Sequence, residues 1–410
     1  MNGRILRIES DETLIAEMKR IGPEPAGLDI MKPKGRFVVI RLEGVTCAAA
    51  NIMKQEMLSR GGDVVISNMV YRLQDKTPTD VLILGTHAQF RELVGKLRIQ
   101  PLKTLQAAAE ELNRLMGCCD APRTGTMTIG GRVFRWSERT YVMGIVNVTP
   151  DSFSGDGLEH DLERVAAQAR RFVECGADLL DIGGESTRPG SAPVSVDEEL
   201  RRVIPAVRLL KKHVSIPLSV DTSRADVAEA ALIEGAAMIN DVWGMNKDPR
   251  MRAVVSRAQV PVVLMHNRME GGTVGSSDVT GAHIREARYD DVMADVCREL
   301  RETADAAVEA GILPEHILVD PGIGFAKTPE QNLHVMGRLG ELKSLGYPIL
   351  LGTSRKSFIG HVLQRPPADR IWGGAASVAL GIAGGAHIIR VHDVGEMVQV
   401  ARMADAIRKS

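Results

Sequence analysis

The sequence predicts an α/β protein in which a (β/α)8 TIM barrel follows a smaller α+β domain. Three observations support this prediction. The chain has 410 residues, which is more than one domain of roughly 150 residues. From Tyr141 onward, short apolar runs alternate regularly with amphipathic stretches, whereas the pattern before residue 135 is mixed. We therefore expect an α+β domain at residues 1–135, including a linker, and a barrel at residues 136–410.

The first domain combines both kinds of periodicity. Strand-like runs occur at residues 37–42, 63–66 and 80–84, and helical spacing occurs at residues 48–60, 89–97 and 104–116. Residues 118–131 contain the Pro, Thr and Gly that are typical of a linker. No motif in this domain indicates a function, so its role stays open.

The second region contains eight repeats of a strand followed by a helix. The predicted strands are residues 141–146, 178–182, 217–220, 237–239, 261–265, 316–319, 348–351 and 387–391. The predicted helices are residues 161–175, 197–212, 225–234, 248–258, 289–310, 329–345, 369–383 and 396–408. Continuously apolar strands alternating with helices indicate a parallel sheet that is buried on both faces. Eight even units favour a closed barrel over a doubly wound open sheet.

Composition excludes several classes of function. Lys and Arg number 51 and Asp and Glu 52, so no overall basic excess attracts nucleic acid or an anionic membrane. Aromatic residues make up 3% of the chain, which is low for a protein that stacks on bases. No run of 18 apolar residues predicts a membrane span, and the charged N-terminal stretch does not resemble a secretory signal. The five cysteines are sparse and indicate free thiols in a reducing cytoplasm.

Polar residues gather where the predicted strands end. They are Asn147, Asp181, Asp221, Asn240, Asp241, His266, Asp320, Lys356, Arg390 and His392. Because active sites of this fold lie at the carboxyl ends of the strands, we expect these side chains to share one opening. An Asp after a strand is often only a helix cap or a turn former. That alternative accounts for single members such as Asp221, but not for Lys356, Arg390 or His392.

These residue types suit a ligand that has both a heterocycle and an anionic group. Carboxylates accept paired N–H bonds from an amidine-like edge, and Arg390 and His392 suit a phosphate. Asn147 and a carboxylate can offer oxygen to Mg²⁺. The sequence has no Walker A run, GxGxxG fingerprint, HExxH or GxSxG motif. Nucleotide-driven chemistry, zinc hydrolysis and serine hydrolysis therefore lose their usual support.

Eight motifs in the barrel region resemble those of the dihydropteroate synthase family, in the family's order. They are MGIVNVTPDSFS (143–154), DIGGESTRPG (181–190), SVDTSR (219–224), IND (239–241), LMH (264–266), DPGIGFAKT (320–328), GTSRKSFIG (352–360) and RVHDV (390–394). The first motif departs from the commonest form at residues 154–157, where small flexible residues are nevertheless kept. The resemblance spans residues 141–394, essentially the whole predicted barrel.

The resemblance implies that the chain condenses 6-hydroxymethyl-7,8-dihydropterin pyrophosphate with p-aminobenzoate, giving 7,8-dihydropteroate and pyrophosphate in folate biosynthesis. It further implies a magnesium-dependent transferase that forms a homodimer in the cytoplasm. Two alternatives remain: a pterin-dependent methyltransferase domain, and a non-catalytic pterin-binding protein. The methyltransferase alternative does not explain the Ser354–Ser357 run or the Arg390 and His392 pair.

The resemblance also implies a role for each site residue. The catalytic group is Asp181, Asp221, Asp320, Lys356, Arg390 and His392. Asp221, Asn240, Asp320 and Lys356 would bind the pterin, and Met265 would pack on its ring. Asn147, Arg390 and His392 would hold the pyrophosphate, with Asn147 also on Mg²⁺ and Asp181 near the metal. The positions expected around p-aminobenzoate are Thr187, Arg188, Pro189, Phe325, Lys327 and Ser357.

Overall fold

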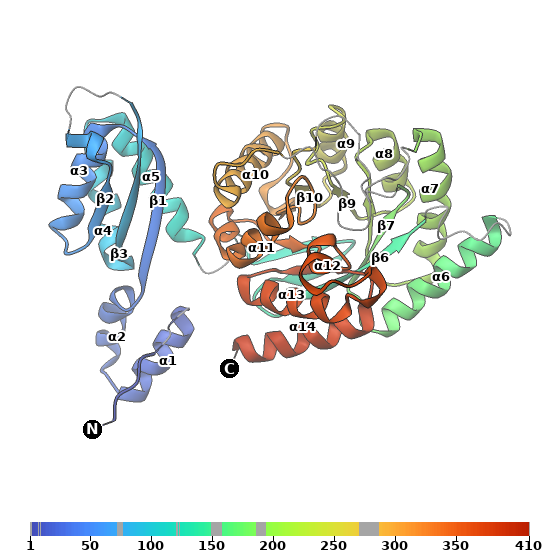
Figure 1. The fold of residues 1–410 in the computed structure, drawn as a ribbon, viewed down its shortest axis with the longest axis horizontal. Coiled ribbons are helices and arrows are strands. Elements are labelled where there is room, and N and C mark those ends of the chain that lie inside the picture. Colours follow the sequence, from blue (N-terminus) through green and yellow to red (C-terminus); the bar gives the residue numbers. More distant parts are fainter. Residues whose placement is uncertain are drawn as a thin grey trace. The chain divides into compact units, whose positions relative to one another are not determined.

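The computed structural model divides into two compact units, Met1–Asp120 and Ala121–Ser410. It describes residues 2–6, 8, 10–71, 77–119, 122, 124–148, 158–185, 194–269 and 287–409. Figure 1 shows the first unit as a small sheet with helices and the second as a ring of strands surrounded by helices.

The first unit is built on a three-stranded antiparallel sheet with the order β1-β3-β2. Its strands are β1 (Phe37–Val45), β2 (Asp63–Ile66) and β3 (Thr79–Thr86). Its helices are α1 (Asp11–Ile21), α2 (Pro25–Met31), α3 (Cys47–Leu58), α4 (His87–Arg98) and α5 (Lys103–Gly117). Buried side chains of the sheet, such as Ile83, join Met53 of α3, Phe90 of α4 and Leu112 of α5 in one core. The structure thus agrees with the predicted strands and helices and adds α1 and α2, which the sequence pattern did not reveal.

The second unit is an eight-stranded parallel barrel with the order β11-β10-β9-β8-β7-β6-β13-β12. A parallel bridge between Val319 and Ile349 joins the two ends of this sheet and closes it. The strands are β6 (Tyr141–Asn147), β7 (Leu179–Gly183), β8 (Leu218–Asp221), β9 (Met238–Asp241), β10 (Val262–Met265), β11 (Ile317–Asp320), β12 (Leu350–Leu351) and β13 (Ile388–Val391). The prediction of eight parallel strands in a closed barrel is confirmed.

Helices surround the barrel, because each crossover between parallel strands must cover the sheet. They are α6 (Leu158–Glu174), α7 (Val196–His213), α8 (Ala225–Ile233), α9 (Met251–Ala258), α10 (Val292–Glu309), α11 (Pro329–Gly337), α12 (Ser357–Leu363), α13 (Ile371–Gly384) and α14 (Val394–Lys409). Two differences from the predicted helices concern the last third of the chain. The helix expected at residues 329–345 ends at Gly337 and continues as a 3₁₀ segment, Leu339–Leu345, and α12 was not expected.

A β-hairpin before the barrel changes the expected domain boundary. Strands β4 (Thr126–Ile129) and β5 (Arg132–Arg135) pair with each other, so part of the predicted linker at 118–131 is a strand. Met127, Ile129, Phe134 and Trp136 are buried against the first residues of the barrel strands. The second unit therefore begins at Ala121 rather than at residue 136, because the hairpin closes the amino-terminal end of the barrel.

Candidate active site

The carboxyl ends of the strands bring the predicted polar residues into one layer. In the sheet register, Asn147 lies beside Gly183, Gly183 beside Asp221, and Asp221 beside Asn240. Met265 pairs with Asp320 in the same way on the next strands. The geometry thus gathers side chains from strands β6 to β11 at one opening, as the fold predicts.

Four of these side chains form a buried polar network. Arg390 Nε donates to Asp181 Oδ2 at 2.6 Å, and its Nη2 donates to Asp221 Oδ2 at 2.8 Å. Asn240 Nδ2 also donates to Asp181 Oδ2, at 2.9 Å. The other carboxylate oxygen of Asp181 is buried and has no hydrogen-bond partner within the described residues. A buried acceptor in this state marks a place where a ligand or ion can complete the bonding.

The buried charges shift one another's pKa values. Burial raises the pKa of Asp221 to about 7, although the nearby Arg390 guanidinium opposes the change. Burial likewise raises the pKa of Asp320, against the attraction of Lys356. The pKa of Lys356 is lowered to about 8, again chiefly by burial. Such shifts in a group of interacting side chains are typical of functional sites.

The loop after β11 places Phe325 beside Lys356. Lys356 Nζ lies 4.7 Å from the centre of the Phe325 ring and donates to the carbonyl of Ile323. Asp320 Oδ1 accepts a hydrogen bond of 2.7 Å from the backbone N–H of Gly322 at the start of this loop. Phe325 also packs with Met265 and Val242 in a small apolar cluster. An apolar surface next to a lysine and a carboxylate suits a flat, polar-edged ring.

The other predicted residues have varied surroundings. His392 accepts or donates a hydrogen bond of 3.0 Å with Ser354. Ser357 is exposed at the first turn of α12. Thr187, Arg188 and Pro189 lie outside the described residues, so the structure does not place them.

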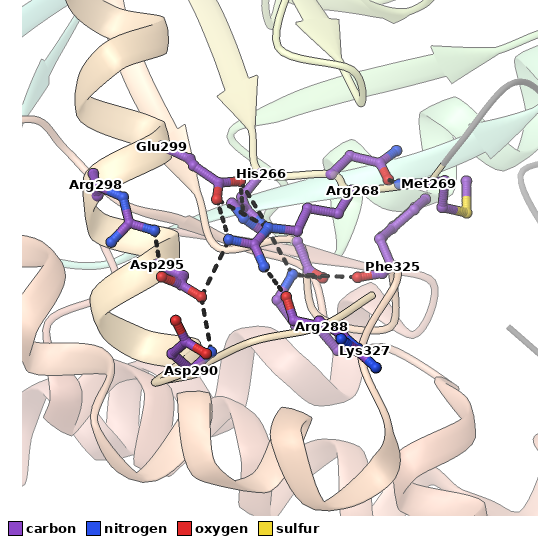
Figure 2. A network of polar contacts seen from close by, with 12 residues as sticks. His266, Arg268, Met269, Arg288, Asp290, Asp295, Arg298, Glu299, Phe325 and Lys327 are labelled. Carbon is purple, nitrogen blue, oxygen red and sulfur yellow. Dashed lines mark hydrogen bonds and ion pairs between the residues drawn. The ribbon is translucent and has the colours of Figure 1, made fainter. Parts of the chain in front are cut away.

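Lys327 belongs to a second polar network beside the first. Its Nζ lies 2.9 Å from His266 Nδ1, and His266 Nε2 lies 3.1 Å from Glu299 Oε2 on α10. Arg268 binds Glu299 in turn (Figure 2). Sequence reasoning noticed His266 at a strand end but missed Glu299 and Arg268. No local signal distinguishes Glu299 from the other acidic residues of its helix, because only the fold brings it to His266.

The described residues contain neither a cluster of metal-ligating side chains nor a helix that could span a membrane. No group of three or more His, Cys, Asp or Glu side chains there could hold a metal ion by itself. In the same part of the chain, no helix is both long enough and apolar enough to cross a membrane.

Residues 143–392 match the profile of the family described as pterin binding enzyme. The chain is 46% identical over 282 residues to a dihydropteroate synthase of Synechocystis, covering 68% of this chain and 94% of that protein. It is 40% identical over 393 residues to a probable bifunctional folylpolyglutamate synthase/dihydropteroate synthase of Halobacterium salinarum, covering 95% of this chain and 45% of that protein. A solved dihydropteroate synthase of Xanthomonas albilineans with 4-aminobenzoic acid superposes with a TM-score of 0.63 at 42% identity, covering 70% of this chain and 99% of that one.

Proposed function

The chain belongs to the dihydropteroate synthases of the pterin binding enzyme family, and from this premise we propose how its own residues carry out the reaction. The reaction joins 6-hydroxymethyl-7,8-dihydropterin pyrophosphate to p-aminobenzoate and releases pyrophosphate. The observation that carries the proposal is the buried network in which Arg390 joins Asp181 and Asp221 at the carboxyl end of the barrel.

The pterin would lie in the opening between the two networks. Asp221, Asn240 and Asp320 offer acceptors and a donor to its N–H-rich edge, and Lys356 donates to its acceptors. Met265, which forms an apolar cluster with Phe325, would pack on the flat ring. The raised pKa values of the two aspartates mean that a ligand's N–H donors, which favour the charged form, would lower them on binding.

The pyrophosphate would meet Arg390, His392 and Asn147. Arg390 is already positively charged and held in place by Asp181, so little reorganisation is needed when negative charge develops on the leaving group. Breaking the C–O bond leaves a pterin-methyl cation, which the buried Asp221 and Asp320 carboxylates would stabilise. The arylamine then attacks this carbon without a strong base, because an aromatic amine is nucleophilic when neutral.

The residues at the opening also fit a role for Mg²⁺. A side chain at Gly183 would approach Asn147 Oδ1 to 3.8 Å and Asp221 Oδ2 to 3.9 Å, so the glycine leaves these oxygens a common space. Asp181, whose Oδ1 has no hydrogen-bond partner among the described residues, lies two residues before Gly183 in β7. Asn147 would hold the ion, with Asp181 near it, and waters and phosphate oxygens would complete the shell. Bound there, Mg²⁺ would neutralise charge on the departing pyrophosphate.

The p-aminobenzoate would bind on the outer side of the pterin. Phe325 offers its ring and Ser357 an exposed hydroxyl at the start of α12. Thr187, Arg188 and Pro189, in the loop after β7, complete the proposed set. The complex of the Xanthomonas albilineans enzyme with 4-aminobenzoic acid supports this class of second substrate.

A homodimer of the barrel is supported by an apolar patch on α12 and α13. Trp372 is 81% exposed and Leu380 67% exposed on α13, and Val362 and Leu363 are exposed on α12. The two helices adjoin, since a side chain at Gly373 would meet Leu363 at 2.8 Å. Exposed apolar side chains on two adjoining helices are typical of an interface, and a second barrel presenting the same side chains would cover them. The five cysteines, all within the described residues, form no disulfide, and we propose a reducing cytoplasm as the location of the protein.

The test of the proposed function is a pyrophosphate-release assay with dihydropterin pyrophosphate, Mg²⁺ and p-aminobenzoate, with the product identified by mass. We expect turnover that depends on the amine and is lost in Lys356→Ala and Asp320→Ala. Retained pterin binding without turnover would contradict the proposal and favour a non-catalytic pterin-binding protein. Methyl transfer from methyltetrahydrofolate would favour the methyltransferase alternative instead.

A further inference from the structure

Lys327 is a buried lysine that the proposed chemistry does not use. Its residue is 2% exposed, and Figure 2 shows its side chain among polar groups of the network. Nζ lies 2.9 Å from His266 Nδ1, 3.1 Å from the carbonyl oxygen of Gly322 and 3.2 Å from that of Phe325. An ammonium group has three protons, and here it has three acceptors. Burial lowers the pKa of Lys327 to about 7, and in the protonated state all three of its donors are engaged by protein groups of the described structure.

The two carbonyl groups that Lys327 binds belong to a single tight turn. The N–H of Phe325 also donates to the carbonyl of Gly322, at 3.1 Å. Gly322, Gly324 and Ala326 have positive φ values of 66°, 81° and 47°. A left-handed alanine is a strained residue that persists only where its surroundings hold it. Lys327 supplies such a hold, because its side chain folds back onto both ends of the turn.

This turn carries the partners of two proposed site residues, Asp320 and Lys356. The Gly322 N–H donates to Asp320, the carbonyl of Ile323 accepts from Lys356, and the Phe325 ring lies 4.7 Å from Lys356 Nζ. A change in the turn would thus move the acceptor and the ring that direct Lys356 toward the opening. Lys327 and Lys356 thus bind carbonyl groups of the same turn, and within the described residues no hydrogen bond joins their side chains directly.

Lys327 also binds His266, which in turn binds Glu299. Burial and the charge of Lys327 lower the pKa of His266 to about 4, so the ring is neutral. Its Nδ1 then accepts from Lys327, while Nε2–H donates to Glu299. Glu299 is fixed by Arg268, whose Nε lies 2.9 Å from Oε1. The backbone N–H of His266 donates to the carbonyl of Asp320 at 2.9 Å, so the same residue also joins the ends of β10 and β11.

We propose that Lys327, anchored by His266 and Glu299, is a positioning residue of the synthase reaction that fixes the Gly322–Phe325 turn and through it the direction of Lys356. The inference rests on the proposed function, and it gives Lys327 a different role from contact with p-aminobenzoate. It predicts that Lys327 acts on the reaction mainly through Lys356.

A double-mutant cycle with Lys327→Met and Lys356→Ala tests this prediction. Single-turnover rates and the dissociation constant of dihydropterin pyrophosphate are measured for the full chain. We expect Lys327→Met to lower the rate or the affinity about 10- to 100-fold in the original background, since small misplacements are costly. In the Lys356→Ala background its effect on the same quantity should be less than about twofold. Where a single-turnover rate is too low to measure, the dissociation constants of the variants are compared in the same cycle.

Equal losses in both backgrounds, or no loss in the original one, would overturn the inference. Should Lys327→Met fail to fold, the pair His266→Asn and His266→Leu replaces it in the same cycle. The Asn side chain can present an oxygen near the place of Nδ1, so we expect it to recover most of the rate that Leu loses. Similar rates for His266→Asn and His266→Leu would contradict the proposal that His266 anchors Lys327. Lack of turnover by the unsubstituted chain would overturn the proposed function itself, and this inference with it.

Discussion

At the amino-terminal end of the barrel, Tyr141, Met143 and Leu179 pack against the hairpin residues Phe134 and Trp136 in a continuous apolar cluster. At the carboxyl end of the same strands, aspartates, a lysine and an arginine are buried together with displaced pKa values. One end removes apolar surface from water, which stabilises the fold. The other end keeps charges away from water, which is costly unless each has a partner. Stability and chemistry are thus separated along the axis of one barrel.

The largest expected effect comes from removing the hairpin. A chain that starts at Ala121 keeps it, whereas a chain that starts at Ser137 loses Met127, Ile129, Phe134 and Trp136. Burying four such side chains contributes roughly 6–12 kcal/mol at about 1.5–3 kcal/mol each. We expect the longer chain to unfold cooperatively in urea and the shorter one to lack a native transition, with circular dichroism as the measurement. Equal transition midpoints for the two chains would show that the hairpin does not support the barrel.

At the opposite end, Arg390→Met should separate activity from folding. The substitution removes the cation proposed to meet the pyrophosphate and leaves Asp181 and Asp221 without their ion pair. We expect the rate of pyrophosphate release to fall about 10²–10³-fold, as for the loss of one preorganised donor. Arg208→Met is the matched control, because Arg208 pairs with Glu234 outside the barrel. A rate within a factor of two of the control would contradict the assignment of Arg390.

A smaller effect is a change in the free energy of unfolding with pH, which should have opposite signs for groups at the two ends of the barrel. Burial lowers the pKa of His387, which contacts Trp136, to about 3. The unfolded chain binds a proton there below about pH 6.5, whereas the folded chain does not, so the stabilisation is complete above that pH and decreases toward pH 3. Between pH 6.5 and 5 we expect a loss of about 1–2 kcal/mol in the free energy of unfolding.

His387→Asn should remove most of this slope in urea titrations, because the Asn oxygen can still accept from the N–H of Ile349, as Nδ1 does. An unchanged dependence of the free energy of unfolding on pH would show that other groups cause it. At the carboxyl end the sign is reversed. The pKa of Asp221 is raised to about 7, so its ionisation costs stability as the pH rises from about 4 to 7.

Most of the barrel could be predicted from the sequence because its signals are local. Each strand, such as Tyr141–Asn147, is an apolar run buried on both faces, and a helix follows it. The hairpin is different, because its first strand lies in the run at residues 118–131 that the sequence predicts to be a linker. Its strands have only four residues each. Their apolar side chains are recognisable as core residues only because they pack against the barrel. The end of the helix expected at 329–345 could not be predicted either, because its apolar pattern continues through the 3₁₀ segment.

The sequence by itself determined which residues could gather at the active site, because strand ends and short motifs carry that information. Asp221 is the last residue of β8, and Asp181 and Arg390 lie within β7 and β13 near the carboxyl ends that the barrel brings together. Only the tertiary structure decided which of them pair and what each neighbour does. Lys327 lies in a motif expected to contact substrate, yet it binds two carbonyl groups of its own loop and His266, which follows β10 and in turn contacts Glu299 of α10. Contacts between distant segments depend on packing in three dimensions, which no local pattern in the chain encodes.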